Sequence, residues 1–200
     1  MEQEAPGKPT ERADEVTLRP FRLADVDAMM AWAMDPEVTV FMTWDPYPSR
    51  EALLSFLRDT ALPHPWFRAV CLPGAEDSPV GSVSVSPTAD ACRAELAYVL
   101  AVADTLKASR LRHCVLVRAH WGKGVATAAV KRAVATVFGE VEGLERVEAL
   151  VDVRNVASQR VLEKAGFRRE AVLRSYCVVR GAVRDMVVYS FIATDHPLVH

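Results

Sequence analysis

HWGKGVATAAV, residues 120–130, is a glycine-marked turn that runs directly into an apolar, alanine-rich segment. Gly122 and Gly124 let the backbone pass close to a ligand. The residues that follow predict a helix over 124–138, whose first turn offers unpaired amides and the positive end of the helix dipole. This stretch is suited to binding an anion such as phosphate, and it is equally consistent with a simple tight turn before a helix.

Two familiar phosphate-binding motifs fit the stretch poorly. A Walker A loop needs a glycine five residues before a Gly-Lys-Ser/Thr group, but Val117 stands there and Gly124 follows the lysine. A dinucleotide fingerprint needs glycine or alanine where Thr127 stands, although Asp152 at the end of the next expected strand resembles its acidic residue. The Walker A motif is excluded, and a nucleotide-dependent oxidoreductase stays as a weak alternative.

Strand-like and helix-like segments alternate along the rest of the chain. Its 200 residues, half of them hydrophobic, are enough for one globular domain with a buried core, which we expect over residues 16–195. Apolar periodicity predicts helices over 23–34, 49–62, 124–138 and 155–165. Extended patterns predict strands over 16–20, 66–72, 80–85, 94–101 and 146–153, and a final hairpin over 170–191. The expected class is a mixed α/β domain.

Composition narrows the classes of partner. The net charge is −2, so no overall positive field would hold the protein on nucleic acid or on an anionic membrane. The four cysteines form no Cys-x-x-Cys pair and match no histidine spacing, so neither a metal site nor a disulfide framework is predicted. Residues 1–15 mix both charges without an apolar run, which predicts a disordered tail. We expect a cytoplasmic protein without a membrane segment.

Two segments, WGKGVA at residues 121–126 and NVASQRVLEKAGF at residues 155–167, together resemble the GNAT acyltransferases. The pyrophosphate loop of that family follows the pattern Arg/Gln-x-x-Gly-x-Gly/Ala, and residues 121–126, WGKGVA, match it after the first position. Residues 155–167, NVASQRVLEKAGF, are similar to the Asn-x-x-Ser...Lys-x-Gly-Phe segment of the branch that includes ribosomal-protein N-terminal acetyltransferases. The two segments lie about 30 residues apart in the family's order, which makes the pair more specific than either motif alone.

The resemblance implies an N-acetyltransferase that moves an acetyl group from acetyl-CoA to an amine of a peptide, protein or small molecule, by direct attack in a ternary complex. It implies a mixed, mostly antiparallel twisted sheet with helices on both faces, and no metal ion. Asn155 would face the pantetheine arm. Backbone amides of the loop would bind the pyrophosphate, and the loop residues concerned are Trp121, Gly122, Lys123, Gly124, Val125, Ala126 and Thr127.

Acetyl transfer to an amine needs a group that neutralises the amine and donors that stabilise the tetrahedral oxyanion. In the family a strand before the phosphate loop supplies a backbone amide for the oxyanion and carries an acidic residue toward the acceptor. Glu95 in AELAYVLA, residues 94–101, is the matching acid, and Glu170 is a second candidate base. Alternation puts Glu95 on the same side as Val99 without saying which face borders the site.

The leaving thiolate needs a proton or a hydrogen-bond donor. Many relatives carry a tyrosine seven residues after the asparagine of the second segment, but Leu162 stands there. Ser158 is expected to hydrogen-bond the leaving sulfur. Tyr176 and Tyr189 from the last strands are further candidates.

Residues 102–117, VADTLKASRLRHCVLV, separate AELAYVLA from the phosphate loop, whereas family members run almost directly from one to the other. We hypothesise that this segment is an insertion. A competing register makes CVLV, residues 114–117, the strand that enters the loop, which would remove Glu95 from the site. The intervening segment and the missing tyrosine support an alternative function, a CoA-binding or interaction module without turnover. The acceptor and the oligomeric state stay open.

Overall fold

The fold is that of a computed structural model, which describes residues 16–39, 41–42, 44–100 and 124–195 of the chain. The predicted tail over 1–15, the hypothetical insertion over 102–117 with its competing strand, and the loop residues Trp121, Gly122 and Lys123 lie outside the described residues.

The strands of the described residues form one seven-stranded sheet in the order β1-β2-β3-β4-β5-β7-β6. Neighbouring strands are antiparallel except β4 and β5, which are parallel because helix α4 (Val125–Glu140) connects them. The predicted strand-helix-strand unit is thus confirmed. The strands are β1 (Thr17–Pro20), β2 (Phe67–Cys71), β3 (Gly81–Pro87), β4 (Arg93–Leu100), β5 (Arg146–Asp152), β6 (Arg168–Val179) and β7 (Ala182–Ile192).

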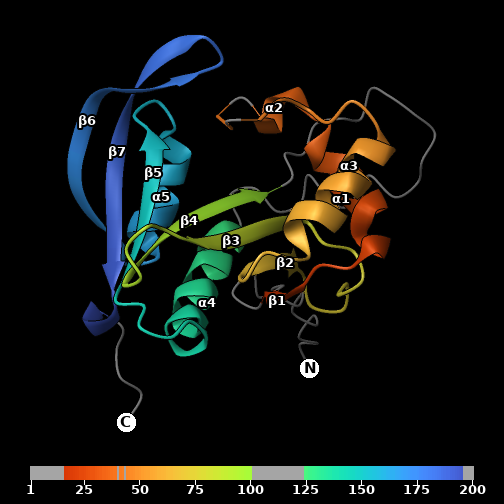
Figure 1. Ribbon diagram of the computed structural model, residues 1–200, viewed down its shortest axis with the longest axis horizontal. Coiled ribbons are helices and arrows are strands. Elements are labelled where there is room, and N and C mark those ends of the chain that lie inside the picture. Colours follow the sequence, from red (N-terminus) through yellow and green to blue (C-terminus); the bar gives the residue numbers. More distant parts are fainter. Residues whose placement is uncertain (1–15, 40, 43, 101–123, 196–200) are drawn as a thin grey trace, which may run out of the picture.

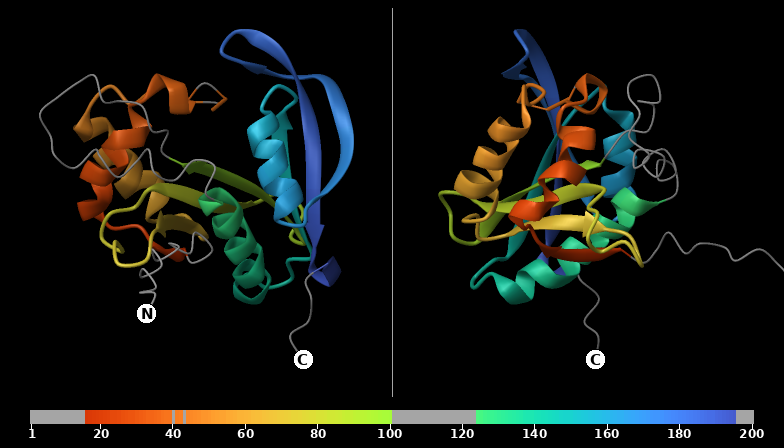
Figure 2. Two further views of the ribbon diagram at one scale, coloured as in Figure 1. Left: turned by 180° about the vertical axis from the view of Figure 1, so that it is seen from behind. Right: turned by 90° about the vertical axis from the view of Figure 1, so that its right-hand side faces the viewer.

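Helices cover both faces of this sheet. Figure 1 looks from the side of α1 (Val26–Ala33) and α3 (Arg50–Phe56), with α4 behind the strands. The reverse view in Figure 2 brings α4 and α5 (Val156–Lys164) forward. In the described ranges, no helix combines the length and hydropathy needed to cross a lipid bilayer. The shorter helical segments are η1 (Leu23–Asp25), α2 (Pro36–Thr39), η2 (Leu57–Ala61) and η4 (Ala193–Asp195).

Local signals in the sequence set the ends of these elements. Ser49 caps α3, accepting a hydrogen bond from the amide of Ala52 at 3.2 Å, as its position predicts. The expected single helix over 49–62 changes geometry, however, because its last turn, η2, is a π-helix. Gly166 follows α5 with a φ of +96°, the left-handed conformation expected of a C′ glycine.

Two hydrophobic cores lie on the two faces of the sheet. The larger core packs α4 and α5 against one face, and the smaller core packs α1 and α3 against the other. Strand β4 contributes to both by alternation: Ala94 and Leu96 belong to the larger core, whereas Val99 packs against the smaller one. Glu95 shares its face with Val99, so it lies on the side of α1 and α3. The structure thereby decides the orientation that alternation alone left open.

Candidate active site

The parallel strands β4 and β5 pair only at their amino-terminal ends. Residues 93–95 align with residues 146–148, but β4 continues to Leu100 and β5 continues to Asp152. Over these continuations β4 stays paired with β3 and β5 stays paired with β7. The two strands therefore separate beyond Glu95, and no other described strand pairs with the facing edge of β4 from Leu96 onward. Such an edge offers backbone donors and acceptors to a ligand.

Glu95 is the last residue of β4 that pairs with β5. Its carboxylate is exposed, and within the described part of the chain it has neither a hydrogen bond nor an ion pair. Glu148 stands beside it on β5 but is held by two arginines. It accepts a hydrogen bond from Nε of Arg146 at 2.6 Å and lies 3.8 Å from Nη1 of Arg93. Of these two carboxylates, Glu95 is the one without an arginine partner among the residues that the structure describes.

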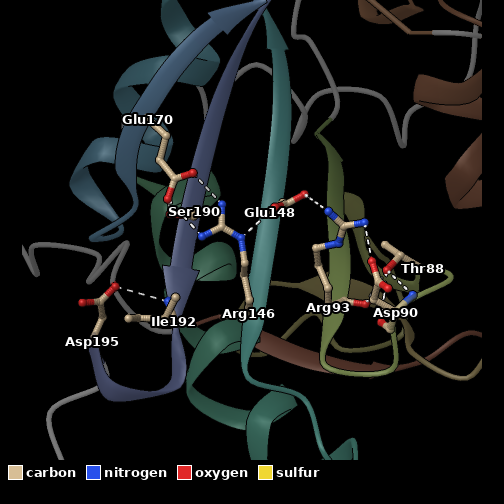
Figure 3. Close-up of polar contacts among 9 residues, drawn as sticks. All are labelled: Thr88, Asp90, Arg93, Arg146, Glu148, Glu170, Ser190, Ile192 and Asp195. Atoms are coloured by element: carbon tan, nitrogen blue, oxygen red, sulfur yellow. Dashed lines mark hydrogen bonds and ion pairs between the residues drawn. The ribbon is translucent and has the colours of Figure 1, made fainter.

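Figure 3 shows that Glu170 belongs to the same polar network on the neighbouring strands. Arg146 donates to both carboxylate oxygens of Glu170, at 3.0 and 2.6 Å, and Oγ of Ser190 donates to Oε1 at 2.6 Å. These hydrogen bonds, led by those from Arg146, lower the pKa of Glu170 to about 2. A carboxylate that holds protons so weakly is a poor general base, so the second candidate base is better explained as a link between β5, β6 and β7.

The described half of the predicted phosphate loop opens helix α4. Gly124 adopts a left-handed conformation with φ of +88°, which favours glycine, and its carbonyl accepts from the amide of Ala128 at 2.9 Å. The amides before Ala128 have no intrahelical acceptor, and the first turn contains no acidic residue. Gly124, Val125, Ala126 and Thr127 therefore fit the binding of an anion at the helix dipole.

The two polar residues predicted in the second segment lie together at the start of α5. Asn155 caps the helix, since its Oδ1 accepts from the amide of Ser158 at 3.1 Å. The Ser158 hydroxyl contacts Tyr98, whose hydroxyl lies 2.5 Å from Oγ and donates to the Ser158 carbonyl at 3.1 Å. Tyr98 belongs to the part of β4 beyond its pairing with β5, and its side chain reaches across to the helix that follows β5.

Tyr98 contacts the predicted site residue Ser158, although the sequence did not point to it. The signal for it was a hydroxyl within an otherwise apolar run, on the opposite face of β4 from Glu95. The two tyrosines that the sequence suggested lie in other surroundings. Tyr189 is fully buried and donates to Oε1 of Glu163 at 2.9 Å. Tyr176 is 51% exposed on β6, which β7 and β5 separate from β4.

On the side of α1 and α3, the segment around residues 39–45 contacts residues that follow β5 and residues at the tip of the β6–β7 hairpin. Arg180, at the tip of the β6–β7 hairpin, donates to Oγ1 of Thr39 at 3.0 Å and lies 3.5 Å from Oδ1 of Asp45. The guanidinium of Arg154, which follows β5, lies 6.0 Å from the ring centre of Phe41. Both contacts join the connection between α2 and α3 to strands beyond the separation of β4 and β5.

Comparison with known proteins shows the family to which this chain belongs. A sequence model described as an acetyltransferase (GNAT) domain matches residues 15–168, more than half of the chain. The chain belongs to the GNAT acetyltransferase family. This GNAT protein is similar to the uncharacterized N-acetyltransferase p20 of Bacillus licheniformis, with 26% identity over 187 residues, covering 92% of this chain and 96% of the relative.

The GNAT fold is equally clear from solved structures. An acetyltransferase of the GNAT family from Bacillus anthracis superimposes with a TM-score of 0.72 at 21% identity, covering 88% of this chain and 94% of that one. The predicted mixed, mostly antiparallel sheet with helices on both faces is confirmed. A shorter similarity, 38% identity over 74 residues, relates 37% of this chain to 40% of the "Putative ribosomal N-acetyltransferase YdaF" of Bacillus subtilis (strain 168).

Membership of the GNAT family establishes the class of enzyme, an acetyltransferase that takes its acetyl group from acetyl-CoA. The predicted enzyme class is confirmed. The oxidoreductase alternative does not survive, because a doubly wound dinucleotide-binding sheet is mostly parallel. Among the described strands of this GNAT protein, only β4 and β5 are parallel.

Proposed function

We propose that this GNAT acetyltransferase moves the acetyl group from acetyl-CoA to an amine of a peptide, protein or small molecule, by direct attack in a ternary complex. One observation carries the proposal. Beyond Glu95 the strands β4 and β5 separate. This leaves an edge of β4 that no other described strand pairs with, between an exposed carboxylate on one face and the Ser158 hydroxyl on the other. These are the groups that an acyl transfer to an amine requires.

The anionic half of acetyl-CoA is proposed to bind at the start of α4. Backbone amides from Gly124 to Thr127 lack intrahelical acceptors and would receive the pyrophosphate, together with the preceding residues of the loop. Asn155 commits its side-chain oxygen to the helix cap, which leaves its amide nitrogen to donate to the pantetheine arm. The pantetheine would then run along the edge of β4 that faces β5 beyond Glu95. There the amide groups of the pantetheine would hydrogen-bond to the backbone of β4 in place of a neighbouring strand.

Glu95 is proposed as the base that removes a proton from the attacking amine, directly or through one water molecule. Among the described residues at the separation of β4 and β5, Glu148 is held by two arginines, whereas Glu95 has no arginine partner. Attack on the thioester carbon gives a tetrahedral oxyanion, which a backbone amide of β4 stabilises. The carbon–sulfur bond then breaks, its electron pair stays on sulfur, and Ser158 donates a hydrogen bond to the departing thiolate.

An α-amino group is the favoured acceptor on chemical grounds. Its reference pKa lies near 8, whereas that of a lysine side chain lies near 10.4, so a carboxylate neutralises the α-amine more easily. The similarity to the YdaF protein, which is named a putative ribosomal N-acetyltransferase, covers 37% of this chain and supports a protein as the acceptor. We therefore place the amino termini of peptides and proteins first among acceptors.

Two measurements test this function. Titration calorimetry with acetyl-CoA, CoA and NAD should show binding of the first two and none of NAD. Thiol release from acetyl-CoA should then be followed with a panel of amines: peptides with a free α-amine, the same peptides acetylated at the terminus but containing lysine, and a polyamine. We expect fastest release with free α-amines. Tight acetyl-CoA binding without thiol release from any acceptor would instead support a binding module.

A further inference from the structure

The contact between Tyr98 and Ser158 joins two elements that the sheet itself leaves apart. Tyr98 projects from β4 beyond its last pairing with β5, and Ser158 lies in the first turn of α5, which follows β5. The phenol oxygen lies 2.5 Å from Oγ of Ser158 and 3.1 Å from the Ser158 carbonyl oxygen. Two hydroxyl groups and one carbonyl thus lie within hydrogen-bonding distance of one another where β4 and β5 separate.

This set has two arrangements of hydrogen atoms. In the first, Tyr98 donates to the Ser158 carbonyl, and the Ser158 hydroxyl donates back to the phenol oxygen. In the second, Tyr98 donates to Oγ of Ser158, which leaves the serine hydrogen free for a third group, because each hydroxyl has one hydrogen and two acceptor lone pairs. The observed distances permit both arrangements. Only the second makes Ser158 a donor to a ligand.

Burial favours the neutral phenol and raises the pKa of Tyr98 to about 12. A thiol has a reference pKa near 8.5, so a thiolate is a weaker base than this tyrosinate by more than a thousandfold. The proton of Tyr98 therefore stays on oxygen when a thiolate forms nearby. The pair is suited to hydrogen-bonding a thiolate rather than to protonating it.

We propose that Tyr98 is a positioning residue that turns the Ser158 hydroxyl toward the leaving sulfur of CoA. The inference rests on the proposed role of Ser158 in the acetyl transfer. As the carbon–sulfur bond breaks, the electron pair stays on sulfur, the Ser158 hydrogen points to it, and Tyr98 donates to Oγ of Ser158. Both O–H bonds stay intact, the amine proton goes to Glu95, and the thiolate takes its proton from water.

The chain offers a matched control for this role. Tyr189 also donates its hydroxyl to a residue of α5, Oε1 of Glu163 at 2.9 Å, but its partner has no hydrogen to pass on. Tyr98→Phe and Tyr189→Phe each remove one hydroxyl that is hydrogen-bonded to the same helix. A purely structural role for Tyr98 predicts similar effects of the two substitutions on both stability and turnover.

The test is a double-mutant cycle on the single-turnover rate of thiol release, measured with acetyl-CoA and the panel amine that reacts fastest. Ser158→Ala is expected to lower this rate roughly 10- to 100-fold, and Tyr98→Phe roughly two- to tenfold, without raising the KM for acetyl-CoA. Because Tyr98 acts through Ser158, adding Tyr98→Phe to Ser158→Ala should cause no further loss. Ser158→Thr retains a hydroxyl and should restore sensitivity to Tyr98→Phe. Tyr189→Phe should keep the wild-type rate.

Failure of this inference differs from failure of the proposed function. An unchanged rate in Ser158→Ala would remove Ser158 from the mechanism and the role of Tyr98 with it. A slow Ser158→Ala variant, combined with an unaffected Tyr98→Phe variant or with losses that multiply in the double variant, would overturn the positioning role alone. Equal losses in Tyr98→Phe and Tyr189→Phe would assign both tyrosines to stability, and thermal unfolding of each variant would show it.

Discussion

Single carboxylates in this enzyme differ in chemistry because their neighbours differ. Glu170 accepts two hydrogen bonds from Arg146 and one from Ser190, and its pKa falls to about 2. Glu95 lies on β4, which β5 and β7 separate from the strand of Glu170, and it is exposed and has no ion-pair partner within the described residues. Both were candidate bases from the sequence, since the residue type is the same. They differ because Arg146, at the start of β5, hydrogen-bonds Glu170.

Removal of the Glu95 carboxylate tests its role as the base. Glu95→Gln is expected to lower kcat roughly 100-fold or more while the Kd for acetyl-CoA changes little, because the amine must then lose its proton unaided. Steady-state thiol release and calorimetry measure the two quantities. Glu142→Gln changes another exposed glutamate without a partner in the described chain and should leave both at wild-type values. Equal activity of the two variants would contradict the assignment.

The Glu170 network makes a prediction about acid stability. The pKa of Glu170 is lowered from its ordinary value of 4.5 to about 2, so the network stabilises the native state above pH 4.5. This contribution is lost as the pH falls from 4.5 toward 2. Glu170→Gln should show a smaller loss of urea-unfolding free energy between pH 5 and 3 than the wild type. With the side chain 42% exposed, we expect the difference to be below about 1 kcal/mol.

The Glu142→Gln variant serves as the control in these unfolding measurements, since Glu142 has no arginine partner in the described part of the chain. It should follow the wild-type dependence on pH. A Glu170→Gln protein whose unfolding free energy falls as steeply as that of the wild type would show that the ion pair contributes nothing to acid stability.

At the scale of elements, the short signals at helix ends and turns predict the structure well. Ser49 and Asn155 cap their helices as expected, and the hairpin turns at Arg180 and Gly181, both with positive φ. Side-chain oxygens and left-handed glycines act within a few residues of chain, so the sequence alone contains the information. The extent of the pairing between β4 and β5 cannot be predicted in this way, because it depends on the groups that pack between the two strands.

Two glycines give opposite predictions for substitution by alanine. Gly166 has a φ of +96°, and an added Cβ would lie 3.3 Å from Cε2 of Phe191, so Gly166→Ala should destabilise the protein by about 1–2 kcal/mol. Gly139 is exposed near the end of α4, where an added Cβ meets nothing within 4 Å. Gly139→Ala should stabilise it by about 0.5 kcal/mol. Urea unfolding monitors both, and changes of the same sign would refute the pairing.

At the scale of the whole molecule, polar contacts join segments that are far apart in sequence. Arg180 reaches Thr39 across 141 residues, and Glu140 at the end of α4 accepts hydrogen bonds from Trp66 at 2.7 Å and Arg68 at 3.0 Å. The second contact fixes α4 to β2 on the side of the larger core. The first bridges the two parts of the enzyme that face each other across the separation of β4 and β5.

The Arg180 bridge should matter more for the acceptor than for acetyl-CoA. It lies on the α1 and α3 side of the sheet, the side of Glu95, whereas the proposed pyrophosphate site is the start of α4 behind it. Arg180→Gln is expected to raise the KM for the amine severalfold and to leave the KM for acetyl-CoA unchanged. Arg174→Gln, an exposed arginine on the same hairpin, should alter neither. A rise in the KM for acetyl-CoA alone would contradict this view.

The sequence by itself determined the element order, the helix caps, the strand-helix-strand unit and the resemblance to GNAT enzymes, because each depends on neighbouring residues or on short motifs. The tertiary structure decided the face of β4 on which Glu95 lies, the neutralisation of Glu170 and the meeting of Tyr98 with Ser158. These features depend on contacts between residues 24 to 60 positions apart, or on which helix covers which face. Local sequence patterns do not predict contacts between residues so far apart in the chain. These groups come together only in the packed sheet.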